Sequence, residues 1–259
     1  MTATYTLWHK HMRKMLAQPA EITGMLIQPI LWVVLFGVGM KSMFASMEGS
    51  TGSYIAFMAP GIIALTALGG AIAGGSVWLN ERREGTIKEY LAAPIFRTSI
   101  LAGNASSVET KVLIQVVVIF LVSLVMGAKI SSNPLELLGA LILIIAFGLG
   151  FAGIALAIAS VTDSPEAYHM MIMILNLPLL FASNALYPIE VMPDWMKVLA
   201  YLNPVTYLIS GLRELLFTND NIVAKTDAVE LWLCFVIIAL FAFVGMFLAK
   251  KAFKKSLTN

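Results

Sequence analysis

Long uninterrupted apolar stretches dominate the pattern of polar and apolar positions along this chain. Six stretches of 17 to 32 residues contain no Asp, Glu, Lys or Arg, and the charged residues gather between them. A helix needs about 20 mostly apolar residues to cross a bilayer. The pattern therefore predicts six membrane-spanning helices, and the continuous apolar runs argue against strands. The expected spans are about 22–40, 54–79, 108–128, 137–160, 166–187 and 231–249.

The first twenty residues follow a different pattern, that of an amphipathic helix. Tyr5, Trp8, Met12 and Met15 fall on one helical face, and the basic residues fall elsewhere. Such a helix beside a first span is expected to lie in the membrane interface. A simple positively charged anchor is a compatible interpretation. A cleaved signal peptide is the competing interpretation of the first apolar run, which is long for that role.

Composition narrows the class of protein further. The 259 residues are 59% hydrophobic and 12% charged, whereas a soluble domain carries about 25% charged residues. A soluble enzyme is therefore excluded, and a net charge of +2 excludes a soluble nucleic-acid binder. The single cysteine, Cys234, excludes an internal disulfide. We expect an all-α polytopic membrane protein forming one transmembrane domain over residues 1–259.

The distribution of basic residues predicts how the chain is oriented. With six spans both termini lie on one side, which would carry eleven Lys and Arg residues against five on the other side. Basic residues are enriched in cytoplasmic loops. We therefore expect both termini in the cytoplasm.

Two segments between the spans contain more charged, aromatic or apolar residues than a simple connecting loop needs. Residues 80–97 hold seven charges and allow a short amphipathic helix over 81–94. This segment is either a solvated loop or a docking helix for a cytoplasmic partner. Residues 188–227 mix aromatic residues, proline and apolar runs. Asn203 is placed to cap a helix that begins at Pro204. We expect this region to be re-entrant, either as a gate or as a lid of structural value only.

The predicted fifth span carries the most polar face, which is either a wall of a substrate pathway or a site of hydrogen bonding between helices. Polar side chains are costly on lipid, so this face should look at protein or at a cavity. The second and fourth spans carry small residues at intervals of four, which favour close helix packing inside one chain or self-association. The residues expected on the fifth-span face are His169, Met173, Asn176, Leu180, Asn184 and Tyr187.

Catalytic motifs are missing from the chain. The dipeptide Gly-Lys never occurs, so there is no phosphate-binding loop, and no H-E-x-x-H, C-x-x-C or G-x-S-x-G is present. The chain has three histidines and one cysteine, which argues against a zinc site. We expect no enzyme activity and no cofactor in this chain.

Two motifs, taken in order, resemble the membrane subunits of type-2 ABC exporters. The first is similar to the family's cytoplasmic E-R-x-x-G-T-x-x-x-L-x-x-P pattern and holds Glu81, Arg82, Gly85, Thr86, Tyr90, Leu91 and Pro94. The second is similar to its Y/F-P, P-x-W and N-P-x-T-Y patterns with a following arginine, and holds Tyr187, Pro188, Pro193, Trp195, Asn203, Pro204, Thr206, Tyr207 and Arg213.

The resemblance implies a half-transporter in a bacterial or archaeal cell membrane that exports hydrophobic drugs, antibiotics or lipid-like molecules. Two copies would pair among the membrane lipids, and each would dock a separate ATP-binding subunit that holds ATP and Mg. Alternatives are a polysaccharide or glycolipid exporter permease, a stand-alone secondary transporter, and a membrane scaffold or enzyme. The resemblance assigns coupling to the ATP-binding subunit to Glu81, Arg82, Arg83, Glu84, Gly85, Thr86, Lys88, Tyr90, Leu91 and Pro94. It assigns the exit gate to Pro188, Trp195, Asn203, Pro204, Tyr207 and Arg213.

Overall fold

The computed structural model describes residues 2–39, 51–92, 95–217 and 229–256, and helices are the only regular elements within these ranges. This confirms the predicted all-α class. The helices are α1 (Thr2–Ala17), α2 (Pro19–Gly39), α4 (Thr51–Arg83), α5 (Thr86–Ala92), α6 (Arg97–Val125), α7 (Pro134–Val161), α8 (Pro165–Phe181), η1 (Ile189–Val191), α9 (Asp194–Leu202), α10 (Pro204–Leu216) and α11 (Leu231–Ser256).

Among the described residues, five helices are long and apolar enough to cross a membrane, namely α2, α4, α6, α7 and α11. The remaining expected span, the fifth at 166–187, corresponds to α8, which has 17 residues and ends at Phe181. The prediction of a helix as far as 187 is therefore wrong. Ser183 and Asn184 follow the helix end, and residues of these types favour turns over helix interiors.

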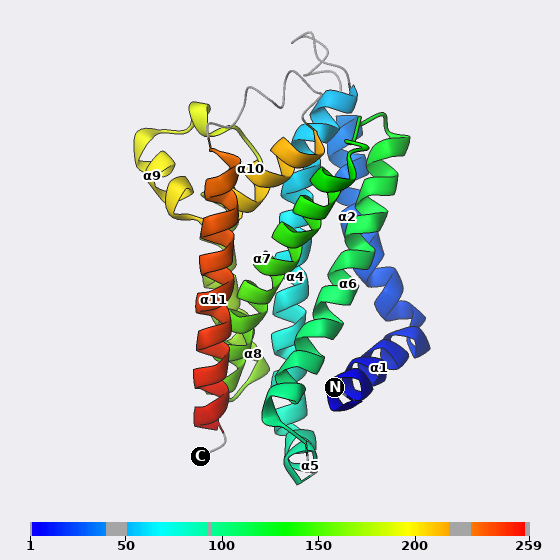
Figure 1. The fold of residues 1–259 in the computed structure, drawn as a ribbon, viewed down its shortest axis with the longest axis vertical. Coiled ribbons are helices and arrows are strands. Elements are labelled where there is room, and N and C mark those ends of the chain that lie inside the picture. The colour runs from blue at the N-terminus through cyan, green and yellow to red at the C-terminus, as the bar shows by residue number, and fades with distance from the viewer. Residues whose placement is uncertain (1, 40–50, 93–94, 218–228, 257–259) are drawn as a thin grey trace.

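The long helices form an elongated bundle around α4 (Figure 1). Helices α2, α6 and α7 pack against α4, and α11 lies along α7. The start of α1 and the end of α11 lie toward the same end of the bundle, together with α5 (Figure 1). We call this end the termini end. Helix α9 lies at the opposite end (Figure 1).

Glycines allow the closest helix contacts inside this one chain. A Cβ atom at Gly70 or Gly74 of α4 would lie 2.4 Å from Val112 or Val108 of α6. A Cβ atom at Gly153 of α7 would lie 2.2 Å from a backbone oxygen of α11. These positions of the small-residue motifs are thus used for packing within the chain.

The segment expected to be one coupling helix over 81–94 is divided in two. Helix α4 continues through Arg83, and α5 begins at Thr86. Gly85 lies between them with a φ of +82°, a left-handed conformation that glycine adopts without strain. The prediction of one helix is wrong because this turn allows the chain to leave the axis of α4.

Helix α10 returns into the bundle instead of crossing it. Its N-cap is Asn203, whose side-chain oxygen accepts a hydrogen bond from the backbone N–H of Val205, and Pro204 is its first residue. This confirms the predicted cap. The helix packs against α4, α7 and α11, and nearly all of its side chains are buried.

Candidate functional site: two polar networks and a membrane-embedded cavity

At the termini end, Glu81 joins three helices. The Nζ of Lys10 in α1 lies 3.1 Å from a carboxylate oxygen of Glu81 near the end of α4. The hydroxyl of Tyr90 in α5 donates to the same oxygen over 3.0 Å, and Lys10 also contacts Tyr90. Glu81 therefore ties the interfacial helix, the central helix and the short helix α5 together. We call Lys10, Glu81 and Tyr90 the junction network.

Ionisation in the junction network follows from its surroundings. Burial lowers the pKa of the neighbouring His11, so its imidazole is neutral near pH 7 although it lies 4.0 Å from Glu81. Burial is also the main cause of the raised pKa of Tyr90. The phenol therefore stays protonated and can donate its hydrogen bond. Lys10 is thus the cation that balances Glu81.

Arg82 makes a second connection at the same end. Its guanidinium donates to the backbone oxygens of Ala159 and Ser160 at the end of α7, the latter over 2.5 Å. It also lies 2.9 Å from the carboxylate of Asp163 in the loop before α8. Neighbouring residues of α4 therefore link α5 and α1 on one side with the α7–α8 connection on the other.

The other predicted coupling residues surround this connection. Arg83 and Glu84 are exposed, whereas Gly85 and Thr86 are half-buried. Lys88 and Leu91 lie on α5, and Pro94 lies outside the described residues. The structure places the described members of the set at one end of the bundle, on α4, on the following turn and on α5.

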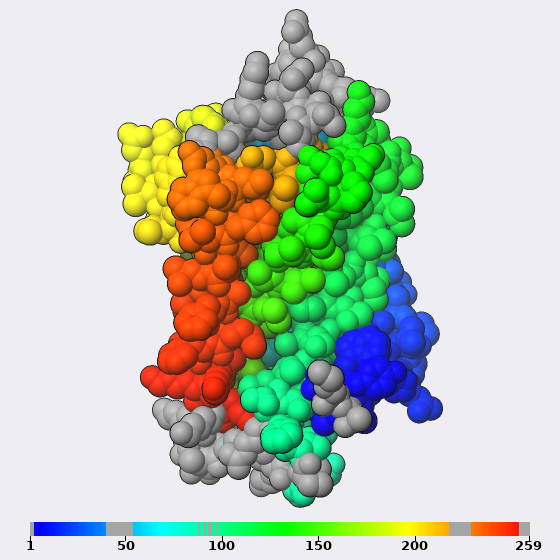
Figure 2. Space-filling view, in the orientation of Figure 1, coloured from blue at the N-terminus to red at the C-terminus, as the bar shows by residue number. Residues whose placement is uncertain are grey.

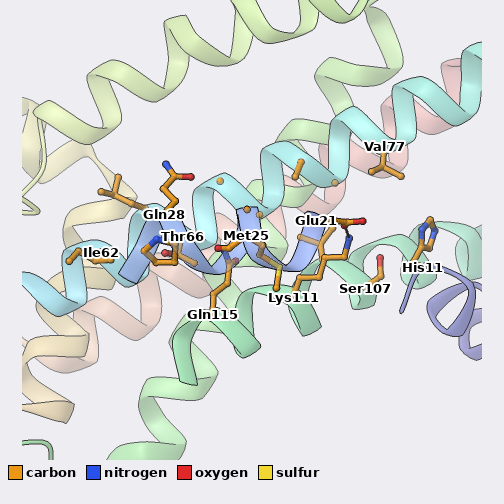
Figure 3. Close-up of a pocket in the computed structure, with 18 of the residues that line it drawn as sticks. His11, Glu21, Met25, Gln28, Ile62, Thr66, Val77, Ser107, Lys111 and Gln115 are labelled. Carbon is orange, nitrogen blue, oxygen red and sulfur yellow. Dashed lines mark hydrogen bonds and ion pairs between the residues drawn. The ribbon is translucent and has the colours of Figure 1, made fainter. Parts of the chain in front are cut away.

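A cavity of about 390 Å³ lies between α2, α4 and α6, with α1 at one end (Figure 3). Small residues of α4, including Gly69 and Ala73, leave the space on one side. Trp32 and Met25 contribute apolar surface from α2. The cavity is therefore mostly apolar along α4, where Thr66 is the polar exception, and most of its polar groups come from the other helices.

An ion pair crosses this cavity between two spanning helices. The Nζ of Lys111 in α6 lies 2.5 Å from a carboxylate oxygen of Glu21 in α2 (Figure 3). Gln115 donates to the backbone oxygen of Met25 over 2.6 Å. Gln28 and Thr66 add further polar groups to the lining. Such a lining can hold an amphipathic molecule, with its apolar part along α4 and its polar part at the pair.

Sequence reasoning missed this cavity. The signal was present in Gln28 and Gln115, each an isolated amide within an apolar run. Polar residues in membrane spans are costly and usually face protein or a cavity. The polar residues of the fifth span are more densely spaced and give a stronger signal than these two isolated amides.

The residues predicted for the fifth-span pathway do not share one face. His169 and Met173 are exposed on α8, and Leu180 is half-buried. Asn176 lies beside α4 and α7, where its side-chain oxygen is buried and has no hydrogen-bond partner among the described residues. Asn184 and Tyr187 lie beyond the end of the helix, so their predicted helical phase is wrong. None of the six lines the α2/α4/α6 cavity.

Arg213 of α10 lies at the centre of a second polar network. This arginine is buried, with 2% of its surface exposed. Its guanidinium donates over 3.2 Å to the backbone oxygen of Phe57 and over 2.7 Å to that of Asn184. It also lies 3.8 Å from the centre of the Phe57 ring. The amide of Asn184 in turn donates to Ser210. We call Arg213, Phe57, Asn184 and Ser210 the buried network.

The remaining residues predicted for the gate lie around the buried network in different environments. The amide of Asn203 donates to the backbone oxygens of Leu179 and Ala182, which ties α10 to the end of α8. The hydroxyl of Tyr207 donates to the backbone oxygen of Tyr201. Pro188 and Pro204 are half-buried, and Trp195 of α9 is 67% exposed. Arg213 and Asn203 therefore hold α4, α8 and α10 together.

Comparison with known proteins adds an independent line of evidence. The family model described as "ABC-2 type transporter" matches residues 2–217. The chain is 34% identical to a protein named transport permease ycf38 from Porphyra purpurea over 205 residues, which are 78% of this chain and 70% of the relative. It is 24% identical to the daunorubicin resistance ABC transporter permease protein DrrB1 of Streptomyces coeruleorubidus, over 83% of this chain and 75% of the relative. It is 26% identical to the multidrug ABC transporter permease YbhR of Escherichia coli K12, over 71% of this chain and 49% of the relative.

Proposed function

This chain belongs to the ABC-2 type transporter family, a family of membrane transport subunits, and we propose that it is the permease of an ATP-driven exporter. In this proposal two copies pair, each copy docks a separate ATP-binding subunit at α5, and the termini end faces the cytoplasm. ATP and Mg are held by the partner subunit. The substrate class is hydrophobic drugs, antibiotics or lipid-like molecules, in line with the names of two relatives.

The observation that carries the proposal is the junction network. Helix α5 follows a turn at the end of α4, and Tyr90 of α5 shares its Glu81 contact with Lys10 of α1. A displacement of α5 by a docked subunit would therefore act on α1 and α4 together. Arg82 would pass the same displacement to the connection between α7 and α8.

Substrate would bind in the α2/α4/α6 cavity and at the exposed face of α8. In Figure 1, α2 and α8 lie on opposite sides of α4, so a second copy is needed to bring an α8 face toward the cavity. That face is rich in methionine, and methionine adapts to varied apolar partners. Its exposed residues are Met170, Met171, Met173, Ile174 and Leu177.

The test is co-purification with an ATP-binding subunit, followed by an ATPase assay in nanodiscs. Glu84→Ala changes an exposed carboxylate in the turn before α5. We expect at least a fivefold loss of substrate-stimulated ATPase activity with normal recovery of the permease itself. The matched control is Glu190→Ala, which removes an exposed carboxylate from η1, far from α5 along the chain.

Equal ATPase activity in both variants would contradict docking at α5. Failure of any ATP-binding subunit to co-purify would contradict the exporter proposal as a whole. Substitution of the ion pair by Lys111→Met and Glu21→Gln together tests the cavity, and we expect a changed substrate range with unchanged basal ATPase activity. An unchanged substrate range would place substrate elsewhere.

A further inference from the structure

A second hollow lies between α6 and α11, in the half of the bundle toward the termini end. It has a volume of about 460 Å³ and is floored by small residues of α4 and α7, among them Ala71, Gly75 and Ala152. The red lower half of α11 and the teal lower part of α6 form its two sides (Figure 2). We call this hollow the α6/α11 groove.

The walls of the groove fit a hydrocarbon chain. Phe243, Met246 and Phe247 of α11 face Leu101 and Ala105 of α6 across it. Both helices are candidate membrane spans, so the groove lies in a part of the surface that lipid surrounds. From Phe243 to Lys250 the helix rises about 10 Å, which is the reach of the groove along the bundle. An occupant of this stretch must be apolar, because the walls offer it few hydrogen-bond partners.

The groove ends in a basic residue. Lys250 is its only charged lining residue in the described part of the chain, and Thr98 at the start of α6 also lines it. Lys250 is near the end of α11, where the helix leaves its apolar stretch. A cation and a hydroxyl at the mouth of an apolar groove match a phospholipid, whose phosphate lies next to its acyl chains. Basic pockets between membrane helices recognise anionic lipid headgroups in this way.

We propose that the α6/α11 groove binds one anionic phospholipid of the leaflet at the termini end. One acyl chain lies between α6 and α11, and the phosphate lies at Lys250 and Thr98. The lipid is a bound component of the folded permease and not its cargo. Gly74 and Asn104 line both this groove and the α2/α4/α6 cavity. The outer walls differ, because α2 borders the cavity and α11 borders the groove.

The test measures lipid retention and uses neither transport nor nucleotide, so it is independent of the proposed function. Purified protein is exchanged into micelles containing equal amounts of phosphatidylglycerol and phosphatidylcholine, and retained lipid is counted by native mass spectrometry. We expect one phosphatidylglycerol per chain in preference to phosphatidylcholine. Lys250→Ala should reduce this preference about fivefold, the effect of one lysine near an anionic surface.

Two controls separate the groove from general charge effects. Lys251→Ala removes the next lysine, which is exposed on α11 and does not line the groove, and we expect retention to stay near the unsubstituted level. Ala105→Phe fills the groove and should abolish retention of either lipid. Its control, Val117→Phe, adds a ring to an exposed position of α6 outside the groove.

Three results would overturn the proposal. These are equal loss in the Lys250→Ala and Lys251→Ala variants, unchanged retention in Ala105→Phe, and no retained lipid in the unsubstituted protein. Because Lys250 is exposed, its substitution leaves the fold intact, and the proposal stays testable even if Ala105→Phe does not fold.

Discussion

The two polar networks lie at opposite ends of α4 and differ in their contact with water. In the buried network, Arg213 is 2% exposed and donates to backbone oxygens that belong to α4 and to the turn after α8. In the junction network, the Lys10 side chain is 45% exposed and its partners are side chains. Hydrogen bonds in a dry interior are costly to break, whereas exposed pairs exchange with water at little cost. One end is thus built to stay fixed, and the other end can rearrange.

This difference also decides how each network can serve transport. A helix end that must move with a docked subunit needs contacts that break and reform. A re-entrant helix that closes the far end of the bundle needs contacts that hold it in place.

Arg213→Ala should cost about 3 kcal/mol or more of stability, since it leaves a cavity and deprives buried carbonyl oxygens of donors. The measurement is the folded fraction that survives heating in detergent, followed by size-exclusion chromatography. The control is Arg83→Ala, which removes an exposed arginine at the termini end and should leave the heating curve within about 0.5 kcal/mol of the parent. Similar curves for the two variants would contradict the contrast.

Gly61→Ala should also act at the rigid end. Its added Cβ would lie 2.8 Å from the backbone oxygen of Ala185, in the turn that supports the buried network. Overpacking against backbone costs about 1 to 3 kcal/mol. The matched substitution is Gly69→Ala on the same helix, where no atom lies within 4 Å, and we expect it to be neutral or slightly stabilising in the same heating assay. An equal loss in both variants would contradict close approach to Ala185 as the cause of the effect.

Gly85→Ala should cost about 1 kcal/mol through backbone conformation alone, because the position has positive φ and open space around it. Gly85→Asn should cost less, since asparagine tolerates the left-handed region. The measurement is again thermal stability, with coupled ATPase activity as a second readout. If alanine and asparagine were equally tolerated and activity were unchanged, the turn would not matter for the placement of α5.

The Lys10–Glu81 pair should show the smallest effect on stability. A double-mutant cycle with Lys10→Ala and Glu81→Ala should give a coupling energy of at most about 1 kcal/mol, because the lysine side chain is 45% exposed and water competes for its charge. Coupled ATPase activity should fall more than stability does. A coupling energy of several kcal/mol would place this junction with the rigid network and remove the contrast.

Continuous apolar runs were enough to predict most of the fold. The helices α2, α4, α6, α7 and α11 lie where charge-free stretches lie, because the cost of placing a charge in lipid is local. The Asn203-Pro204 start of α10 was likewise predictable, since a cap involves neighbouring residues only. The division of the coupling segment at Gly85 could not be predicted from the sequence. Glycine permits a left-handed turn but does not require one.

The functional residues divide in the same way. Charge density marked the segment around Glu81 and Arg82 as important, but not their partners Lys10, Ser160 and Asp163, which lie about 70 to 80 residues away along the chain. The helical phase assigned to Asn184 failed because the helix stops three residues earlier. The position of Asn184 depends on its hydrogen bonds with Arg213 and Ser210 of α10. These partners are distant along the chain, so the sequence around Asn184 does not identify them.

The sequence by itself determined the class of the protein, the order of its apolar helices, the cap of α10 and the resemblance to a transporter family. Only the tertiary structure decided where each polar residue points. Glu109, Thr110 and Lys111 are consecutive in α6, yet Glu109 is buried against Gly148 of α7, Thr110 accepts from Trp8 of α1 and Lys111 pairs with Glu21 of α2. Successive side chains of a helix point about 100° apart, so each meets a different neighbour. Partition into the membrane depends on each segment alone, whereas the pairing of polar groups depends on which helices surround it.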